Sequence, residues 1–169
     1  MIVYRTPMLA DGPALDAMAR QIWLETFEHS ASPENIAAYV AGAYGPDGKL
    51  LRDLADPAVR FHVADDVGRI AGYCKLTAPF VEEAGPGDVQ LSQLYVAADY
   101  HGRGIAQTLM DWALTTARAD GAPALLLTVW EENHRAKRFY DRYGFVHVGD
   151  YAFPTGDQID RDLVMRLAL

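Results

Sequence analysis

A Gly-Arg-Gly turn, Gly102 to Gly104, separates the β-rich stretch LSQLYV from the amphipathic stretch IAQTLMDWAL. Glycines lack the Cβ atom that would keep a ligand away from the backbone. A helix that begins directly after them presents free N–H groups and a partial positive charge, and this combination binds phosphate groups. The sequence therefore predicts an anion-binding turn between a strand and a helix.

Two familiar phosphate motifs do not fit this turn. The P-loop pattern requires Gly-Lys followed by Ser or Thr, whereas Gly104 is followed by Ile105 and Ala106. The dinucleotide fingerprint requires a third glycine at the position of Gln107. By itself, a Gly-x-Gly turn is a simple helix start about as often as it is a ligand site. The surrounding sequence must therefore distinguish between these two possibilities.

The histidines and the cysteine indicate neither a metal site nor a disulfide. The histidines have no HExxH spacing and no accompanying cysteine pairs, which predicts that no metal binds; they are His29, His62, His101, His134 and His147. The single cysteine, Cys74, stands in the apolar stretch IAGYCKLTA and is expected to be a buried core residue.

Length and composition predict one domain over residues 1–169, because a chain of 169 residues that is 50% hydrophobic can build one core. No long apolar stretch and no basic, apolar leader is visible, so we expect a cytoplasmic protein with no membrane partner. A net charge of -8 argues against nucleic-acid binding and mildly favours the attraction of a cationic small molecule.

The residue pattern then predicts the elements that position the glycine turn. Ile2 to Arg5 is typical of a strand. Asp11 with Pro13 predicts a helix that runs to about Phe27, and Ser32 with Pro33 predicts a second helix. A further short helix is expected around Leu50 to Leu54.

The rest of the chain alternates strands with two helices. Strands are expected at Arg60–Ala64 and Arg69–Thr77, joined by a hairpin turn, and then at Val89–Val96, Ala124–Val129, Phe145–Val148 and Leu163–Leu167. One helix follows Gly104 and stops at Asp120-Gly121, and another covers Asn133 to Tyr143. The predicted order is β-α-α-β-β-β-α-β-α-β-β, an α/β (α+β) fold.

Two segments at this spacing carry a family resemblance. The run LYVAADYHGRGIAQTLMDWAL, followed by LTVWEENHRAKRFYDRYGF, resembles the GCN5-related N-acetyltransferase (GNAT) family. The family's second motif is complete here, as Asn133, Ala136, Phe139, Tyr140, Gly144 and Phe145. Its pyrophosphate loop is complete except that His101 replaces the leading Gln or Arg. The resemblance implies a mixed, mostly antiparallel central sheet of seven strands flanked by helices.

A closer resemblance, to the bacterial spermine/spermidine acetyltransferases, extends over three segments. These are WLETFEHSASPENIAAYV, VWEENHRAKRFYDRYGF and the ending GDQIDRDLVMRLAL. The resemblance implies acetyl-CoA as the acetyl donor and a small cationic amine, such as a polyamine, as the acceptor. Homodimers are common in the family, but the sequence does not fix the assembly.

The resemblance assigns a role to each residue of the cofactor site. The N–H groups from Gly102 to Ala106, including that of Ile105, receive the pyrophosphate, with Arg103 adding charge from the side. Leu94, Tyr95 and Val96 pair by backbone with the pantetheine arm, and an N–H near Val96 stabilises the oxyanion. Asn133 binds the pantetheine amides, Arg142 reaches a phosphate, and His101 stands where the family has a further side-chain contact.

Tyr140 is the expected catalytic residue. The leaving thiolate has a conjugate thiol pKa of about 8.5, and a nearby phenol with a pKa of about 10 can protonate it when the site favours the transfer. The general base stays open. The strand positions that face the site carry Gln90 and Ser92, which are not bases, so they hold either a water or the substrate. The other options are the carboxylates Glu25, Glu28, Glu82 and Glu83, of which Glu25 and Glu28 are also expected to bind distant ammonium groups.

Two alternatives to a small cationic acceptor remain. Within the enzyme class, the acceptor is a peptide or protein N-terminus or a lysine side chain, which an open groove along the fourth and fifth strands would favour. Outside that class, the chain is a non-catalytic acyl-CoA sensor that keeps the phosphate turn. The aromatics Tyr39, Tyr44, Trp130 and Tyr151 are either core or cleft wall, and the sequence leaves both open.

Overall fold

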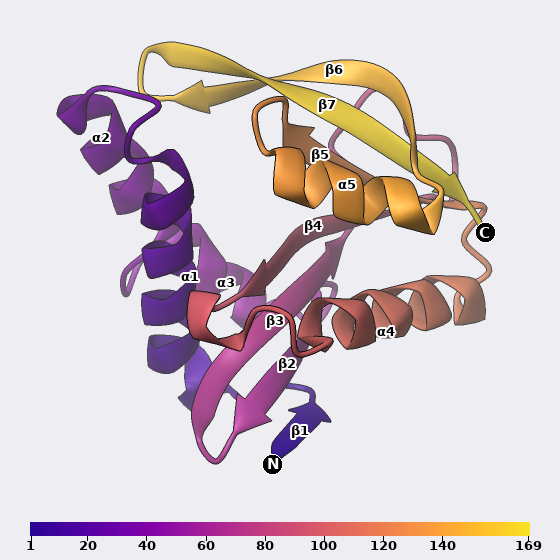
Figure 1. Cartoon of the computed structure of the whole chain (residues 1–169), viewed down its shortest axis with the longest axis horizontal. Coiled ribbons are helices and arrows are strands. Elements are labelled where there is room, and N and C mark those ends of the chain that lie inside the picture. The colour runs from indigo at the N-terminus through magenta and orange to yellow at the C-terminus, as the bar shows by residue number, and fades with distance from the viewer.

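The computed structural model describes all 169 residues and contains one seven-stranded sheet with the strand order β1-β2-β3-β4-β5-β7-β6 (Figure 1). All neighbouring strands are antiparallel except β4 and β5, which are parallel. The predicted mixed fold with a mostly antiparallel sheet is thus confirmed. The strands are β1 (Ile2–Arg5), β2 (Arg60–Asp66), β3 (Arg69–Thr77), β4 (Val89–Val96), β5 (Ala124–Trp130), β6 (Val146–Thr155) and β7 (Gln158–Ala168).

Five α-helices cover the two faces of the sheet, and none has the length and apolar composition that crossing a membrane requires. They are α1 (Gly12–Phe27), α2 (Pro33–Ala43), α3 (Lys49–Ala55), α4 (Ile105–Ala119) and α5 (His134–Tyr143). One core joins α4 and α5 to the sheet, and a second core joins α1 and α3 to the opposite face of β2 and β3. Figure 1 shows α1 to α3 on one side of the molecule and α4 on the other.

The helix starts follow the predicted capping residues with one difference. The Ser32 hydroxyl accepts a hydrogen bond from the N–H of Asn35 at 3.2 Å, as expected of an N-cap. Asp11 also precedes its helix, but its carboxylate binds the Arg5 guanidinium at 2.7 and 2.9 Å instead of a helix N–H. The Arg5 ion pair therefore joins β1 to the start of α1, while Pro13 fixes the first helical turn.

Two parts of the predicted order need correction. The short helix expected around Leu50 to Leu54 is confirmed as α3, so the order written with two helices between the first two strands must be extended to three. The last two strands are much longer than Phe145–Val148 and Leu163–Leu167 and meet in a hairpin around Gly156. Their outer halves carry Asp150, Asp160 and other charged residues, which hid the strand pattern, since only part of each strand is buried.

The strands β4 and β5 separate after a short contact. Their backbones pair only at Val89 with Leu125 and at Gln90 with Leu126. Beyond Gln90, β4 continues on β3 alone while β5 continues on β7. The edge of β4 from Leu91 to Val96 therefore faces an opening in the middle of the sheet, and the glycine turn that precedes α4 lies at its end.

Candidate active site

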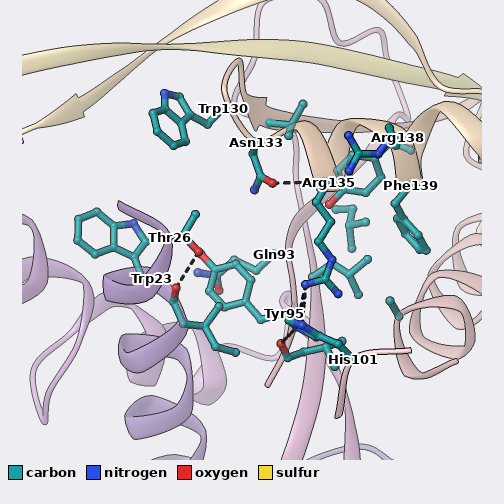
Figure 2. A pocket seen from close by; sticks show the side chains of 18 of the residues that line it. Trp23, Thr26, Gln93, Tyr95, His101, Trp130, Asn133, Arg135, Arg138 and Phe139 are labelled. Carbon is teal, nitrogen blue, oxygen red and sulfur yellow. Dashed lines mark hydrogen bonds between the residues drawn. The ribbon is translucent and has the colours of Figure 1, made fainter. Parts of the chain in front are cut away.

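A cleft of about 810 Å³ occupies the opening between β4 and β5, within the usual volume range of ligand sites. Its walls come from α1, β4, the glycine turn, α5 and the β6–β7 hairpin. Figure 2 shows Trp23 and Thr26 on the α1 side and Trp130, Asn133, Arg135 and Arg138 opposite them, with Gln93 and Tyr95 between. Residues from both ends of the chain therefore meet around one cavity.

The glycine turn is built to receive an anion. Gly102 and Gly104 have φ values of +77° and +79°, which favour glycine, and a Cβ added at Gly102 would meet no atom within 4 Å. The backbone N–H groups from Gly102 to Gln107 donate to no other group of the protein. A run of free N–H groups at the start of a 15-residue helix binds phosphate well.

The free edge of β4 borders the same cleft. Leu94, Tyr95 and Val96 line the cleft, as expected of residues that pair with an extended pantetheine arm. The His101 imidazole also lines the cleft, and its Nε2 lies 2.9 Å from the carbonyl oxygen of Val96. His101 therefore ties the turn to the end of β4.

Basic side chains of α5 form a stripe along the same part of the cleft. Arg135, Arg138 and Arg142 line it, and their spacing of three and four residues places them on one helix face. The Arg135 Nη1 atom lies 2.6 Å from His101 Nδ1 (Figure 2). The sequence predicted only Arg142, although this helical spacing would have identified the other two.

Arg103 and Asn133 differ in part from their predicted roles. Arg103 does not line the cleft, because its guanidinium lies over the Tyr100 ring, 4.9 Å from the centroid. Asn133 does line it, but its side-chain oxygen caps α5 by accepting a hydrogen bond from the N–H of Ala136 at 3.2 Å. Its amide NH₂ group is left to donate to a ligand.

Tyr140 lines the cleft on the inner face of α5 and is 9% exposed. Its ring packs against Phe139 and Phe145, with centroids 5.6 and 5.8 Å away. Burial, with a smaller contribution from Tyr95, raises the pKa of the Tyr140 phenol well above its ordinary value. The hydroxyl therefore keeps its proton throughout the neutral range, as a proton donor must before it acts.

The far end of the cleft, which we call the acceptor chamber, is walled by five aromatic side chains. Trp23 stacks on Tyr39 at 4.2 Å and packs against Phe27 at 5.2 Å, and these rings continue to Phe153 and Trp130. The structure thus places Tyr39 and Trp130 in the cleft wall. Tyr44 is a core residue instead, and Tyr151 packs against Phe80 away from the cleft.

Two carboxylates line the cleft, and both lie toward the acceptor chamber. Glu25 of α1 was expected there, and it accepts a hydrogen bond from Gln21 at 2.8 Å on the exposed side. Asp162 of β7 was missed. It precedes the fully buried Val164 by two positions, and residues two apart point to the same face of a strand, which is the signal that could have revealed it.

The other predicted acceptor residues lie elsewhere, except Ser92. Ser92 lines the cleft, and its hydroxyl is hydrogen-bonded to that of Thr77. Gln90 is completely buried, and its carbonyl oxygen accepts a hydrogen bond from the N–H of Phe80 at 3.0 Å. Glu28, Glu82 and Glu83 do not line the cleft, so none of them faces an acceptor bound in it.

The cleft thus combines free backbone N–H groups and arginines at one end with carboxylates and aromatic rings at the other. A model of the Acetyltransferase (GNAT) family matches residues 15–145, and the chain therefore belongs to the GNAT family. It is an acetyl-CoA-dependent N-acetyltransferase. The predicted enzyme class and co-substrate are thus confirmed, and the non-catalytic sensor is set aside.

Three known proteins illustrate the range of its similarities. An uncharacterised N-acetyltransferase from Mycobacterium tuberculosis is 34% identical over 157 residues, which cover 93% of this chain and 97% of that protein. The PaiA N-acetyltransferase from Thermoplasma acidophilum, solved in complex with coenzyme A, superposes with a TM-score of 0.80 at 22% identity over 100% of this chain and 99% of that one. A proposed ribosomal protein bS18-alanine N-acetyltransferase from Bacillus subtilis is 25% identical over 76% of this chain and 80% of that protein.

Proposed function

We propose that this enzyme transfers an acetyl group from acetyl-CoA to the primary amine of a small cationic acceptor, with polyamines as the first candidates. The division of charge along the cleft carries the proposal. Arg135, Arg138 and Arg142 stand beside the phosphate-binding turn, whereas the cleft's carboxylates, Glu25 and Asp162, stand at the acceptor chamber. A cationic amine is attracted to the second region and repelled by the first.

The acceptor chamber suits an ammonium group on an apolar stem. Faces of Trp and Tyr rings attract cations, and apolar methylene groups pack against the same rings. Trp23, Tyr39 and Trp130 supply such rings within a few ångströms of one another or of the neighbouring Phe27. Polyamines combine ammonium groups with methylene chains, which is why we place them first.

The β6–β7 hairpin, which carries Phe153 and Asp162 of the chamber, is held against the N-terminal helices at its tip, and this favours a small acceptor over a polypeptide. Asn35 of α2 donates to the Asp157 carboxylate at 2.6 Å and accepts from the Asp157 N–H at 3.2 Å. Gln158 donates to the carbonyl oxygen of Ser30 at 2.6 Å. These bonds hold the tip of the β6–β7 hairpin against the segment that joins α1 and α2, so a peptide has no straight path through this end.

In the proposed reaction, a group of this chain stabilises each negative charge, both those that develop during the transfer and those of the donor's phosphates. The amine nitrogen attacks the thioester carbonyl, and a backbone N–H near Val96 stabilises the oxygen that becomes negative. As the carbon–sulfur bond breaks, Tyr140 donates its proton to the departing sulfur. The free N–H groups of the glycine turn and the arginines of α5 hold the donor in place.

The direct test measures thiol release from acetyl-CoA with spermidine, spermine, a simple monoamine, a lysine peptide and a peptide with N-terminal alanine. Release with the polyamines at a much higher kcat/KM than with either peptide is the expected result. The alanine peptide is included because of the name of the Bacillus subtilis relative. Release with that peptide alone would replace the small acceptor by a protein N-terminus.

Loosening the hairpin tip should affect the acceptor without affecting the donor. Asn35→Ala removes both hydrogen bonds to Asp157, which are exposed and therefore contribute little to stability. We expect the acceptor KM to rise by roughly threefold to tenfold while the acetyl-CoA KM stays constant. Ser32→Ala is the matched control, since it alters the same helix end but no contact with the hairpin. Equal changes in both KM values would show that the hairpin has no specific role in the acceptor chamber.

A further inference from the structure

Asp162 is unusual among the buried carboxylates of this protein. Three aspartates are buried, namely Asp53, Asp88 and Asp162. Asp53 is paired with Lys49 and Lys75 at 2.8 and 2.7 Å, and Asp88 is paired with Arg166 at 3.2 Å. Asp162 has no cationic partner, although it is only 7% exposed. An unpaired buried carboxylate is costly, so its presence in a cleft points to a ligand.

The position of Asp162 explains why no side chain of the protein neutralises it. On β7 it stands opposite Trp130 of β5 and Tyr151 of β6. Its neighbour Arg161 alternates to the other face of the strand, where it binds Asp150 and Glu131. The cleft is therefore the side from which a cation can approach Asp162, because the residue lines that cavity.

We propose that Asp162 is the general base, which takes a proton from the ammonium group of the acceptor before the amine attacks. The inference rests on the proposed function, because it requires an acceptor that arrives as a cation. Glu25, the other carboxylate of the cleft, is exposed on the rim and bonded to Gln21, so it is placed to attract the acceptor and not to deprotonate it.

The surroundings of Asp162 fit a group that must both accept and release a proton near neutral pH. Burial, reinforced by the negative charge of Asp160, raises the pKa of Asp162 to about 7, and the Thr128 hydroxyl acts in the opposite direction. The other titratable groups facing it are phenols, Tyr39 from α2 and Tyr95 from β4, with Tyr151 across the strand on β6. No positive charge faces Asp162.

Every proton in the proposed transfer is accounted for. The ammonium group gives one proton to Asp162 and becomes a neutral amine, whose nitrogen forms the new bond to the acetyl carbon. The sulfur leaves with the electron pair of the broken carbon–sulfur bond and takes the Tyr140 proton. The remaining excess proton of the nitrogen restores the Tyr140 phenol. Asp162 then releases its proton to solvent, so one acetyl transfer yields one amide, one thiol and one proton.

The experiment compares the pH profiles of kcat/KM for the wild-type enzyme and Asp162→Asn, with the best acceptor of the panel. The wild-type value should rise with pH through about 7, as Asp162 loses its proton. For Asp162→Asn, kcat/KM should not rise with pH in this range, and at pH 8 it should be more than tenfold lower than the wild-type value. Glu34→Gln, which removes an exposed carboxylate of α2 outside the cleft, is the charge-matched control and should keep the wild-type profile.

A second acceptor separates proton transfer from simple attraction. An analogue with fluorine next to the amino-bearing carbon has a lower amine pKa, so more of it arrives already neutral and needs no base. The defect of Asp162→Asn should therefore shrink with the fluorinated amine. A defect that is confined to the acceptor KM, with the rise near pH 7 retained, would overturn the proposal and leave Asp162 a binding residue.

Two further measurements test the role of Asp162 in other ways. The first uses a different variant, and the second needs no acceptor. Asp160→Asn removes the nearby negative charge, so the rise of kcat/KM should move to lower pH.

Thermal melting tests the raised pKa of Asp162 without any acceptor. Because the pKa of Asp162 is about 7 in the folded state and about 3.9 in unfolded chains, wild-type stability should fall relative to Asp162→Asn as the pH rises from 4 to 7. A constant difference would refute a raised pKa. If only peptides are acetylated, the proposed acceptor is wrong, while the same profile on the peptide still decides the role of Asp162.

Discussion

Replacing Tyr140 by phenylalanine is expected to lower kcat about 100-fold and to leave the affinity for acetyl-CoA nearly unchanged. The substitution removes one hydroxyl, and the ring contacts with Phe139 and Phe145 remain. Without the hydroxyl the sulfur must leave as an unprotonated thiolate, which is the slower path. Steady-state rates with saturating substrates give kcat, and isothermal calorimetry with acetyl-CoA gives the affinity.

Tyr143→Phe is the matched control for this variant. It makes the same change on the same helix, but the Tyr143 hydroxyl donates to Asp111 at 3.1 Å and the residue does not line the cleft. We expect a small loss of stability and an unchanged kcat. If both variants keep the wild-type kcat, then Tyr140 only packs against its neighbours and the sulfur obtains its proton elsewhere.

Gly102→Ala should weaken acetyl-CoA binding by about 10-fold to 100-fold, the free energy of one or two hydrogen bonds to a charged group. The new methyl group projects into the open space from which the pyrophosphate would approach the free N–H groups. The φ of +77° also strains an alanine. Calorimetric titration with acetyl-CoA and with coenzyme A measures the loss.

The contribution of backbone strain can be separated from that of ligand contact. Gly121, at the opposite end of α4, has a φ of +74°, and a Cβ there would also meet no atom within 4 Å. Gly121→Ala should therefore lower the melting temperature as much as Gly102→Ala does, with acetyl-CoA affinity unaffected. Equal losses of affinity in both variants would mean that the turn acts only through the stability of α4.

The donor half of the site could be predicted from sequence because its parts are close together in the chain. The strand that carries Leu94 to Val96, the turn at Gly102 and the start of α4 form one continuous segment, and Asn133 caps the short helix that carries Tyr140. Local rules for glycine turns and helix starts apply to such segments without knowledge of the fold. Arg103 shows the limit of these rules, because the attraction of its guanidinium to the Tyr100 ring depends on a rotamer.

The acceptor half could not be predicted in the same way. Its wall combines Trp23 and Tyr39 with Trp130, Phe153 and Asp162, which meet only after the sheet has formed. Gln90 and Ser92 were natural choices from strand alternation, yet the first points into the core. The base was sought among glutamates of the N-terminal helix and of a loop, while Asp162 lies on a strand whose length the residue pattern concealed.

The bonds between Asn35 and Asp157 bridge 122 positions of the chain, so they can form only after the chain beyond Asp157 has been synthesised. The glycine turn and α5, to which we assign the phosphate end of acetyl-CoA, are complete once α5 is made, whereas β5 still lacks its neighbour β7 and the acceptor chamber still lacks Phe153 and Asp162. Contacts this distant in sequence form late in folding. A nascent or truncated chain is therefore expected to be catalytically silent, and the capacity for acetyl transfer arrives only with the last strand.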